Sequence, residues 1–294
     1  MKIQALPENR KSFLTSELPW AADPLAIDGG SLEKAERWLP VATIATRGPR
    51  TCDIYDSLES ALTRSELLTF DHVPVRDGDR TVGLLHMAAL RQAGATERDR
   101  RVRDKMDPLT DSNLMSADAG ILAFVATADS SPCRLLVDGD RVDAIVTLSD
   151  LQKLPVRPAV FLLITHLELL MARFIRANWH DSSDWLSLLT DGRREQIERN
   201  WNELEKNELA IDKIAVTQFC DKRTIILGAG KLLPNNVTVK EAEKALKAIE
   251  SLRNSVAHAG DYAATRENAM SMAQTTRLAR KWIDWIRDRL DRLN

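Results

Sequence analysis

A short segment near the C-terminal end, residues 252–260, combines residue types that could cleave RNA without a metal ion. Asn254 and His258 share one face of a helix, and Arg253 lies about 100° round it. Cleavage of a phosphodiester needs a base for the 2′-hydroxyl, an acid for the leaving oxygen and a cation for the charge on phosphorus. His258 is therefore predicted as base or acid, Arg253 as the phosphate ligand and Asn254 as the residue that orients one of them.

The same residues have a simpler interpretation. Cations near a helix C-terminus are favoured by the negative end of the helix dipole, typically by ~0.3–1 kcal/mol. An arginine followed five positions later by a histidine also occurs readily by chance, because the chain has 5 histidines and arginine is common in it. The chemical interpretation of Arg253 and His258 therefore needs support from the elements around them.

A second candidate site lies where a predicted strand meets a helix, in the sequence Ile145-Val-Thr147-Leu-Ser-Asp150. A carboxylate there can accept hydrogen bonds from both ribose hydroxyls, while the hydroxyl group and the free amides of a helix N-terminus favour phosphate. Thr147 and Asp150 therefore predict a site for a nucleoside phosphate. The alternative is that Thr147, Ser149 and Asp150 only cap the helix, and spacing alone leaves both interpretations open.

The first half of the chain contains an internal repeat. The sequence VRDGDRTVGLLHMAAL, from Val75, matches LVDGDRVDAIVTLSDL, from Leu136, and the copies lie roughly 60 residues apart. Each copy predicts a helix (residues 57–68 and 117–127), two apolar strands joined by an Asp-Gly turn, and a further helix. Asp-Gly favours a tight hairpin because glycine adopts the positive φ that such turns require.

This pattern resembles the CBS family, whose units occur as tandem pairs that pack sheet against sheet into one module. The resemblance covers about residues 35–154 and implies that a hydroxyl residue and an aspartate three positions later hold the ribose of an adenine nucleotide, a pattern that Thr147 and Asp150 fit. In the first copy His86 and Ala89 stand in their places, so we expect one ligand site. The residues do not distinguish AMP, ADP, ATP, a dinucleotide messenger or an adenosyl compound.

From Pro155 onward the sequence predicts only helices. Strand-like alternation stops at LPVRPA, where Pro155 and Pro158 precede a long amphipathic helix. A capping box from Thr238 to Glu241 begins the penultimate helix, and Gly260 is placed to end it. The other predicted helices cover about residues 160–178, 185–189, 194–209, 213–219 and 265–293.

Within this helical half, residues 252–260 closely resemble the R-N-x-x-x-H signature of HEPN domains. The resemblance covers roughly residues 156–294, and outside the motif it depends on the helix pattern. It implies a metal-independent endoribonuclease with Arg253, Asn254 and His258 as catalytic residues. It also implies a homodimer, because HEPN ribonucleases place two motifs across one cleft. A role in phage defence or as a toxin-like growth-arrest nuclease is implied in the same way.

Composition limits these interpretations. With 294 residues, 44% of them hydrophobic and 29% charged, the chain is long enough and apolar enough for two folded domains. The net charge is -2, so contact with RNA would require a local basic patch.

Cysteine spacing and apolar runs indicate where the protein works. The 3 cysteines are far apart and form no CxxC pair, which favours a reducing compartment such as the cytoplasm and gives no zinc site. We expect no signal peptide, because residues 1–13 contain no long apolar stretch. We also expect no membrane span, because charged or polar residues interrupt the longest apolar run, residues 159–175. The interrupting residues are His166, Glu168 and Arg173.

We therefore expect an α+β protein whose catalysis needs no cofactor and whose partners are RNA, a regulatory adenine nucleotide and a second copy of the chain. The predicted function is a HEPN-type endoribonuclease regulated by nucleotide binding at Thr147 and Asp150. The alternative is a non-catalytic, nucleotide-responsive dimerisation or docking module. The expected parts are an irregular extension (residues 1–34), a tandem CBS module (35–154, copies about 35–97 and 98–154) and a HEPN-like helical domain (155–294).

Overall fold

The computed structural model describes residues 31–92, 99–180, 182–206, 212–258 and 261–293. Most of the predicted N-terminal extension lies outside these residues. The chain forms two compact units: a sheet-containing unit, made of Leu32–Ile164 and Lys244–Lys281, and a helical unit, which includes Thr165–Glu243 and Trp282–Asn294. Compactness in space does not test the domain ranges expected from the sequence, which stay predictions.

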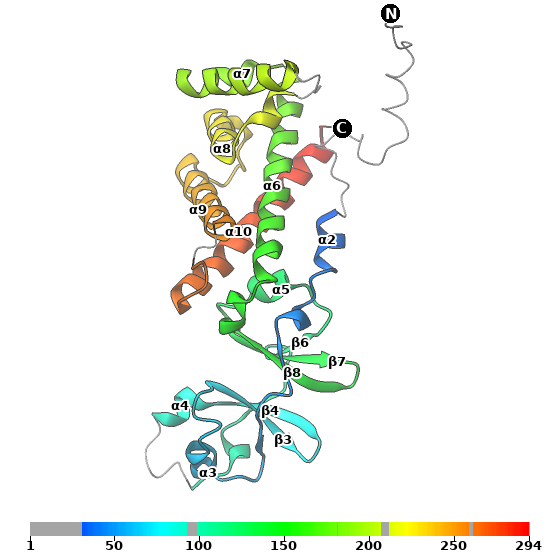
Figure 1. The fold of residues 1–294 in the computed structure, drawn as a ribbon, viewed down its shortest axis with the longest axis vertical. Coiled ribbons are helices and arrows are strands. Elements are labelled where there is room, and N and C mark those ends of the chain that lie inside the picture. The colour runs from blue at the N-terminus through cyan, green and yellow to red at the C-terminus, as the bar shows by residue number, and fades with distance from the viewer. Residues whose placement is uncertain (1–30, 93–98, 181, 207–211, 259–260, 294) are drawn as a thin grey trace, which may run out of the picture. The chain divides into compact units, whose positions relative to one another are not determined.

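Both copies of the repeat contain the same elements in the same order (Figure 1). A 3-10 turn and a short strand are followed by a second strand, a helix, a β-hairpin and a final short helix. The first copy, which follows α2 (Ser31–Glu36), consists of η1 (Val41–Thr43), β1 (Thr46–Arg47), β2 (Cys52–Asp53), α3 (Leu58–Thr63), β3 (His72–Asp77), β4 (Arg80–His86) and α4 (Met87–Arg91). The second copy consists of η3 (Val102–Asp104), β5 (Asp107–Pro108), β6 (Leu114–Ser116), α5 (Ile121–Val125), β7 (Cys133–Asp138), β8 (Arg141–Thr147) and η4 (Leu148–Gln152).

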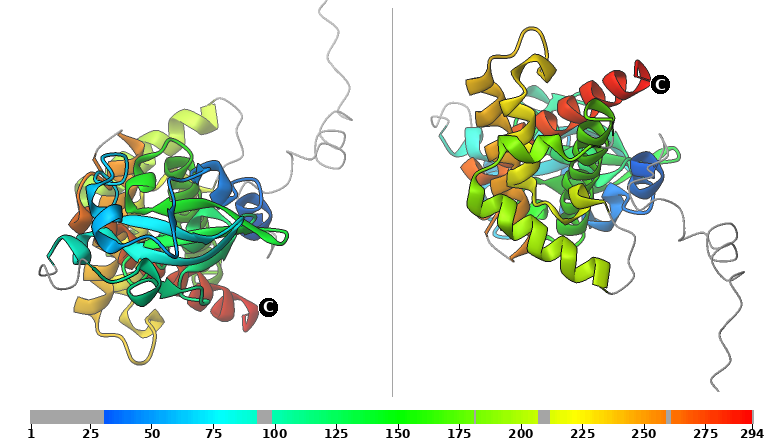
Figure 2. Two further views of the ribbon diagram at one scale, coloured as in Figure 1. Left: turned by 90° about the horizontal axis from the view of Figure 1, so that it is seen from below. Right: turned by 90° about the horizontal axis from the view of Figure 1, so that it is seen from above.

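Each copy gives one strand to the sheet of the other. The two four-stranded sheets have the orders β2-β3-β4-β5 and β1-β8-β7-β6, and their strands are seen from below in Figure 2. Strand β1 of the first copy pairs antiparallel with β8, so that Thr46 lies opposite Ile145. Strand β5 of the second copy pairs antiparallel with β4, so that Gly83 lies opposite Pro108. The two repeats therefore depend on one another for complete sheets.

The two hairpins predicted from Asp-Gly are confirmed. In both, an aspartate and an arginine face one another across the turn, and the strands are antiparallel. Gly78 and Gly139 both have a φ of 61°, a conformation that strains residues with a Cβ atom. Glycine is therefore required at the same point of both copies.

Apolar side chains from the strands form the interior of the repeats. Leu84 of β4 packs against the second sheet, and the Thr81 hydroxyl of the same strand donates to the Val142 carbonyl of β8 at 3.0 Å. The two sheets therefore share part of their interior. The main buried cluster of the first sheet consists of Cys52, Leu58, Ala61, Leu67, Val73, Val75, Leu85, Met87, Leu90 and Val102.

The long helix after the repeats begins earlier than the sequence predicted. Helix α6 spans Val156–Asn178, whereas the prediction began at residue 160. Pro158 lies in its first turn, where backbone N–H groups have no partner within the helix, so a proline there costs no hydrogen bond. The proline that was taken to precede the helix is therefore part of it.

The other helices match the prediction in part. The two shortest predicted helices are 3-10 turns, and α8 was missed, because buried charged residues break its apolar pattern. The capping box is confirmed, since the Glu241 carboxylate accepts a hydrogen bond from the Thr238 amide at 2.9 Å; Gly260 lies outside the described residues. The elements are η5 (Asp184–Leu188), α7 (Asp191–Lys206), η6 (Lys213–Val216), α8 (Phe219–Gly228), η7 (Gly230–Leu232), α9 (Val239–Ala257) and α10 (Arg266–Asp291).

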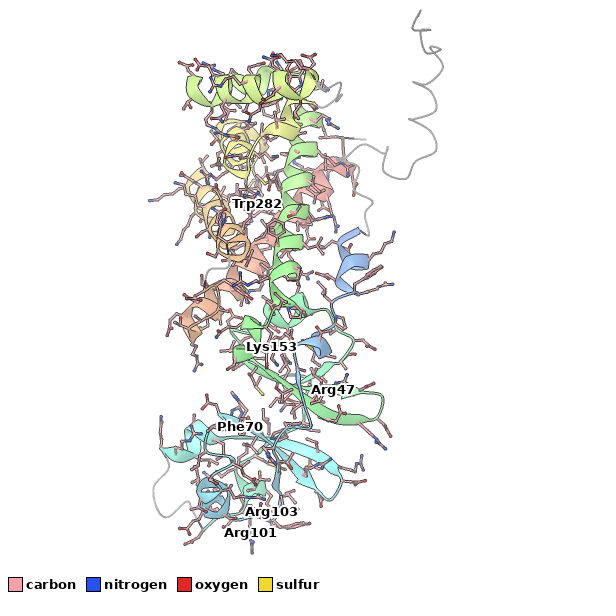
Figure 3. The ribbon with its side chains drawn as sticks, viewed as in Figure 1. Arg47, Phe70, Arg101, Arg103, Lys153 and Trp282 are labelled. Atoms are coloured by element: carbon pink, nitrogen blue, oxygen red, sulfur yellow. The ribbon has the colours of Figure 1, made fainter. Side chains whose placement is uncertain are left out.

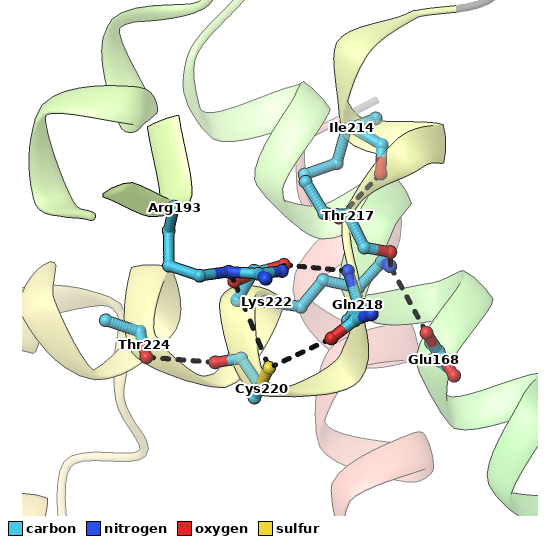
Figure 4. A network of polar contacts seen from close by, with 9 residues as sticks. Glu168, Arg193, Ile214, Thr217, Gln218, Cys220, Lys222 and Thr224 are labelled. Atoms are coloured by element: carbon cyan, nitrogen blue, oxygen red, sulfur yellow. Dashed lines mark hydrogen bonds and ion pairs between the residues drawn. The ribbon is translucent and has the colours of Figure 1, made fainter. Parts of the chain in front are cut away.

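Charged groups are buried inside the helical unit (Figure 4). Arg193 of α7 donates to both carboxylate oxygens of Asp221 of α8, at 2.9 and 2.7 Å. Lys222 of α8 lies 3.3 Å from the Glu168 carboxylate of α6 and donates to the Thr217 carbonyl at 2.7 Å. Each buried charge thus has an opposite charge beside it, which offsets the cost of removing it from water.

Helix α6 is long and apolar enough to cross a membrane by length and composition alone. However, 61% of its most apolar window is buried inside the protein, as in the core helix of a folded protein, so it is a weak indication of a span. The architecture is mixed α+β, with two sheets followed by helices, as predicted. That these helices form a HEPN domain stays a prediction.

Candidate functional site

A cavity of about 1060 Å³ lies within the sheet-containing unit. Both repeats line it, and so does a segment that belongs to neither repeat. The lining residues come from segments 46–50, 69–72, 86–89, 132, 145–152 and 263–269. Thr147 and Asp150, the residues predicted to bind a nucleotide, are among them.

Asp150 is held firmly at the second-repeat end of this cavity. Its side chain is only 8% exposed. One carboxylate oxygen accepts from the Thr147 amide at 2.7 Å and from the Thr147 hydroxyl at 3.2 Å, and the other lies 2.7 Å from the Lys153 ammonium. Thr147 and Asp150 therefore do form a capping box at the start of η4, as the capping interpretation expected. The same carboxylate also lines the cavity, so capping does not exclude a role in ligand binding.

Lys153 connects this end of the cavity with the first repeat. Besides its ion pair with Asp150, its ammonium donates to the Ile44 carbonyl at 2.6 Å, just before β1. Lys153 is marked in Figure 3. Lys153 therefore holds the Asp150 carboxylate in place and joins it to the backbone of the first repeat.

The first-repeat end of the cavity contains two histidines. His86 Nε2 lies 2.8 Å from the Asp107 carboxylate, and its ring meets that of His72 edge-on, with centroids 5.0 Å apart. Burial is the largest cause that lowers the pKa of His72, and His86 lowers this pKa further. His86 and Ala89 line the cavity where the second repeat has Thr147 and Asp150, so this end has no equivalent pair for a ribose.

An aromatic ring and two arginines complete the lining. Phe70, marked in Figure 3, is 42% exposed although it lines a cavity. Arg91 fixes its backbone by donating to the carbonyls of Leu68 and Phe70 at 2.8 and 2.7 Å. Arg50 and Arg266 are exposed and line the same cavity. An aromatic surface, a carboxylate and cations together suit the base, ribose and phosphate of a nucleotide.

The predicted catalytic motif lies at the C-terminal end of α9. Asn254 and His258 are exposed, and Arg253 is half-buried. The His258 amide donates to the Asn254 carbonyl at 3.0 Å, so helical spacing continues to His258 and places both residues on one face. These residues belong to the same compact unit as the cavity. Their catalytic roles stay predictions.

A different arginine occupies the end of α9. Arg157 donates to the Val256 carbonyl at 3.4 Å, and its guanidinium lies 4.9 Å from the centroid of the Tyr262 ring. A cation at the last carbonyls of a helix is stabilising. The role of helix-end cation, which was the alternative interpretation for Arg253 and His258, is therefore supplied by Arg157.

Nothing in the described parts of the chain resembles a metal centre, because no group of three or more His, Cys, Asp or Glu side chains there could hold an ion. Cys52 and Cys133 are buried, and burial is the main cause that raises the pKa of each thiol to about 12. Neither thiol is therefore suited to metal binding or nucleophilic chemistry.

Among the comparisons with known proteins, only the comparison with solved structures gives matches. No family model matches the sequence, and no curated protein matches it. Solved structures do match part of the chain. They are CBS-domain structures. The CBS domain of a bacterial CNNM/CorC family Mg²⁺ transporter in complex with ATP is 19% identical, with a TM-score of 0.35, and the match covers 40% of this chain and 88% of that one.

Two further neighbours are similar over a comparable share of the chain. A CBS-domain-containing protein from Bacillus anthracis is 18% identical with a TM-score of 0.36, and the match covers 42% of this chain and 96% of that one. A hemolysin-like protein containing a CBS domain, from Oenococcus oeni, is 10% identical with a TM-score of 0.35 and the same two coverages of 42% and 96%.

Several residues that line the cavity were not found from the sequence. Phe70 and His72 lie just before and at the start of β3, and the repeat pattern gave no signal for them. Arg266 lies more than a hundred residues after the repeats, at the start of α10. Only the fold brings it to the cavity, so no local pattern could have indicated it.

Proposed function

We propose that the chain is a nucleotide-regulated endoribonuclease of HEPN type, with the cavity as its sensor site. The cavity, at about 1060 Å³, has room for a nucleotide, since ligand pockets usually enclose ~300–1000 Å³. Asp150 accepts the ribose hydroxyls, and Phe70 offers a face on which an adenine ring stacks. The CBS resemblance of the Thr147 and Asp150 pattern favours an adenine nucleotide over other ligands.

Arg253, Asn254 and His258 cleave the RNA. A histidine removes the proton of a 2′-hydroxyl, whose oxygen attacks the adjacent phosphorus. The bond to the 5′-oxygen then breaks, and that oxygen receives a proton from a second histidine, supplied by the partner in a homodimer. Arg253 binds the phosphate oxygens while charge develops on them. The products are a 2′,3′-cyclic phosphate and a 5′-hydroxyl, and each proton transfer contributes typically ~10²–10⁴-fold to the rate.

One observation carries the regulatory part of the proposal. The cavity is lined in part by the segment that begins with Ala263, a few residues after His258, and both belong to the same compact unit. A ligand that contacts this segment in one arrangement of the chain more strongly than in another shifts the balance between the two. The motif therefore responds to occupancy of the cavity.

The cleavage assay uses the purified chain, mixed RNA and EDTA, with products analysed for 2′,3′-cyclic phosphate ends. We expect cleavage by the wild type, and a loss of about a hundredfold or more in His258→Ala. His180→Asn is the matched control, because His180 is also exposed and asparagine tolerates its φ of 47°. Cleavage that is absent, or equal in His258→Ala and wild type, ends the ribonuclease proposal.

A non-catalytic docking module is the second candidate. Two large apolar side chains of the sheet-containing unit are exposed, Trp38 at 85% and Leu154 at 78%. Such side chains are common at protein interaction surfaces when they cluster. This candidate gains support if nucleotide binding is intact while no RNA is cleaved under any nucleotide condition.

A further inference from the structure

We infer that Arg266, at the start of α10, binds the phosphate group of the nucleotide in the cavity. The inference rests on the proposed sensor function and adds a residue from outside both repeats. Arg266 lines the same cavity as Thr147 and Asp150. One ligand therefore contacts the second repeat through its ribose and α10 through its phosphate.

The carboxylates around the cavity already have cationic partners. Asp150 pairs with Lys153 at 2.7 Å, and Asp71 pairs with Arg91 at 3.2 Å. Each of these negative charges is therefore largely neutralised before a ligand arrives. Their presence does not prevent an anionic ligand from binding.

Two lining arginines, in contrast, are available for a ligand. Within the residues that the structure describes, the side chains of Arg50 and Arg266 form no hydrogen bond and no ion pair, and both are exposed. A guanidinium presents a planar fork of donors that matches two phosphate oxygens. Arg266 has an acidic neighbour in Glu267, whose pKa is lowered mainly by hydrogen bonds and further by Arg266. Among the described residues, however, no hydrogen bond engages either guanidinium, so a phosphate is a complementary ligand.

Arg266 also acts electrostatically on the first-repeat end of the cavity. After burial and His86, the positive charge of Arg266 is a further cause that lowers the pKa of His72, against the effect of Asp71. The guanidinium is therefore close enough to affect charge at this wall. A phosphate bound there lies within reach of Arg266 and of the two histidines.

This arrangement makes α10 a detector of the phosphate group. A nucleoside has no phosphate, so it fills the ribose and base positions without forming an ion pair with Arg266 of α10. A 5′-nucleotide also contacts the start of α10, which lies a few residues after His258 in the chain. The ligand that changes activity is therefore a nucleotide and not a nucleoside.

Calorimetry with two ligands and matched variants tests this inference. AMP and adenosine differ by the phosphate, and Arg266→Ala removes its proposed partner. We expect Arg266→Ala to weaken AMP binding about tenfold, equivalent to ~1.4 kcal/mol, and to leave adenosine binding unchanged. Arg266→Lys keeps part of the AMP affinity, because it keeps the charge without the fork. Arg141→Ala is the control, since Arg141 is an exposed arginine of the same unit outside the cavity lining.

Two outcomes overturn the inference. Unchanged AMP affinity in Arg266→Ala shows that the arginine does not contact the phosphate. An equal loss for AMP and adenosine shows that the substitution distorts the site. The proposed function is judged separately with Asp150→Asn, which should weaken both ligands. If Asp150→Asn has this effect while Arg266→Ala has none, the sensor site stands without α10; if the wild type binds neither ligand, both proposals fail.

Discussion

Arg277 of α10 donates hydrogen bonds to both carboxylate oxygens of Asp129, at 2.7 and 2.5 Å. The same guanidinium donates to the Ala126 carbonyl at 2.6 Å, at the end of α5. Helix α10 is thus attached to the second repeat at Arg277 and lines the cavity at its first turn.

Removing this attachment should destabilise the sheet-containing unit. Asp129→Asn keeps the shape but removes the charge. We expect a loss of about 1–2 kcal/mol in the free energy of unfolding, because the Asp129 side chain is only 13% exposed and its hydrogen bonds are charge-assisted. Urea denaturation measures this loss. Arg199→Ala removes an exposed pair with Glu195 and should change stability by less than about 0.5 kcal/mol. Equal effects of the two variants would contradict the account.

The contribution of Asp129 should also depend on pH. Hydrogen bonds from Arg277 are the largest cause that lowers the pKa of Asp129. A carboxyl group with a lowered pKa in the folded state stabilises the protein above its unfolded pKa of about 3.9, and this is lost as pH falls through the folded value. The stability difference between wild type and Asp129→Asn should therefore shrink below about pH 4. A constant difference across that range would disagree with the structure.

Gly83 should be required where the two repeats exchange strands. A Cβ atom at Gly83 would lie 2.7 Å from the Asp107 carbonyl oxygen and 2.7 Å from the Met106 sulfur. Asp107 begins β5, the strand that the second repeat gives to the first sheet, and Met106 directly precedes it. We expect Gly83→Ala to lower the melting temperature, at a cost of about 1–3 kcal/mol. In Gly192→Ala, where no atom lies within 4 Å, stability should rise slightly. A Gly83→Ala protein as stable as wild type would contradict the strand exchange.

His72 should make the sheet-containing unit sensitive to mild acid. Its pKa is lowered in the folded state, mainly by burial, so below the unfolded value of about 6.5 the unfolded chain binds a proton that the folded chain does not. The free energy of unfolding is therefore not reduced by His72 above about pH 6.5, and it decreases as pH falls from there towards the folded pKa of His72. His72→Phe, which keeps a ring, should lose less stability than wild type between about pH 7.5 and 5.5. Parallel losses in the two proteins would argue against a lowered pKa of His72 in the folded protein.

The reactivity of the cysteines should reflect how deeply each one is buried. Burial raises the pKa of Cys52 and Cys133 to about 12, whereas Cys220 is partly exposed. At about pH 8 the first two should carry almost no thiolate, so iodoacetamide should modify Cys220 first in the native protein and all three cysteines in urea. Mass spectrometry of timed samples measures this order. Rapid native labelling of Cys133 would show that the start of β7 is more open than described.

The sequence predicted the parts that depend on neighbouring residues. Gly78 and Gly139 lie in tight turns, and the positive φ of each glycine is set by the turn itself. The capping box at Thr238 likewise involves only residues within one helical turn. The fold class and the repeat followed from such patterns. The start of α6 was misjudged, because a proline in the first turn and a proline before a helix look the same in sequence, whereas its end at Asn178 was predicted correctly.

Long-range contacts could not be predicted in this way. Nothing near Thr46 indicates that β1 completes the sheet of the other repeat, and nothing near Arg266 indicates a cavity formed by residues far earlier in the chain. The candidate ribose site at Thr147 and Asp150 was visible because its residues are adjacent on one turn. Its other wall was not, because it is assembled from several segments by tertiary packing.

The central claim is that occupancy of the cavity controls cleavage at the Arg253 and His258 motif. The most direct measurement is the initial rate of RNA cleavage at increasing AMP concentration, with calorimetric affinity measured on the same samples of wild type and Asp150→Asn. The account predicts that the wild-type rate changes with a midpoint at the calorimetric Kd, and that in Asp150→Asn this midpoint shifts to higher AMP together with the affinity. A rate that stays constant while AMP saturates the wild-type protein would contradict it.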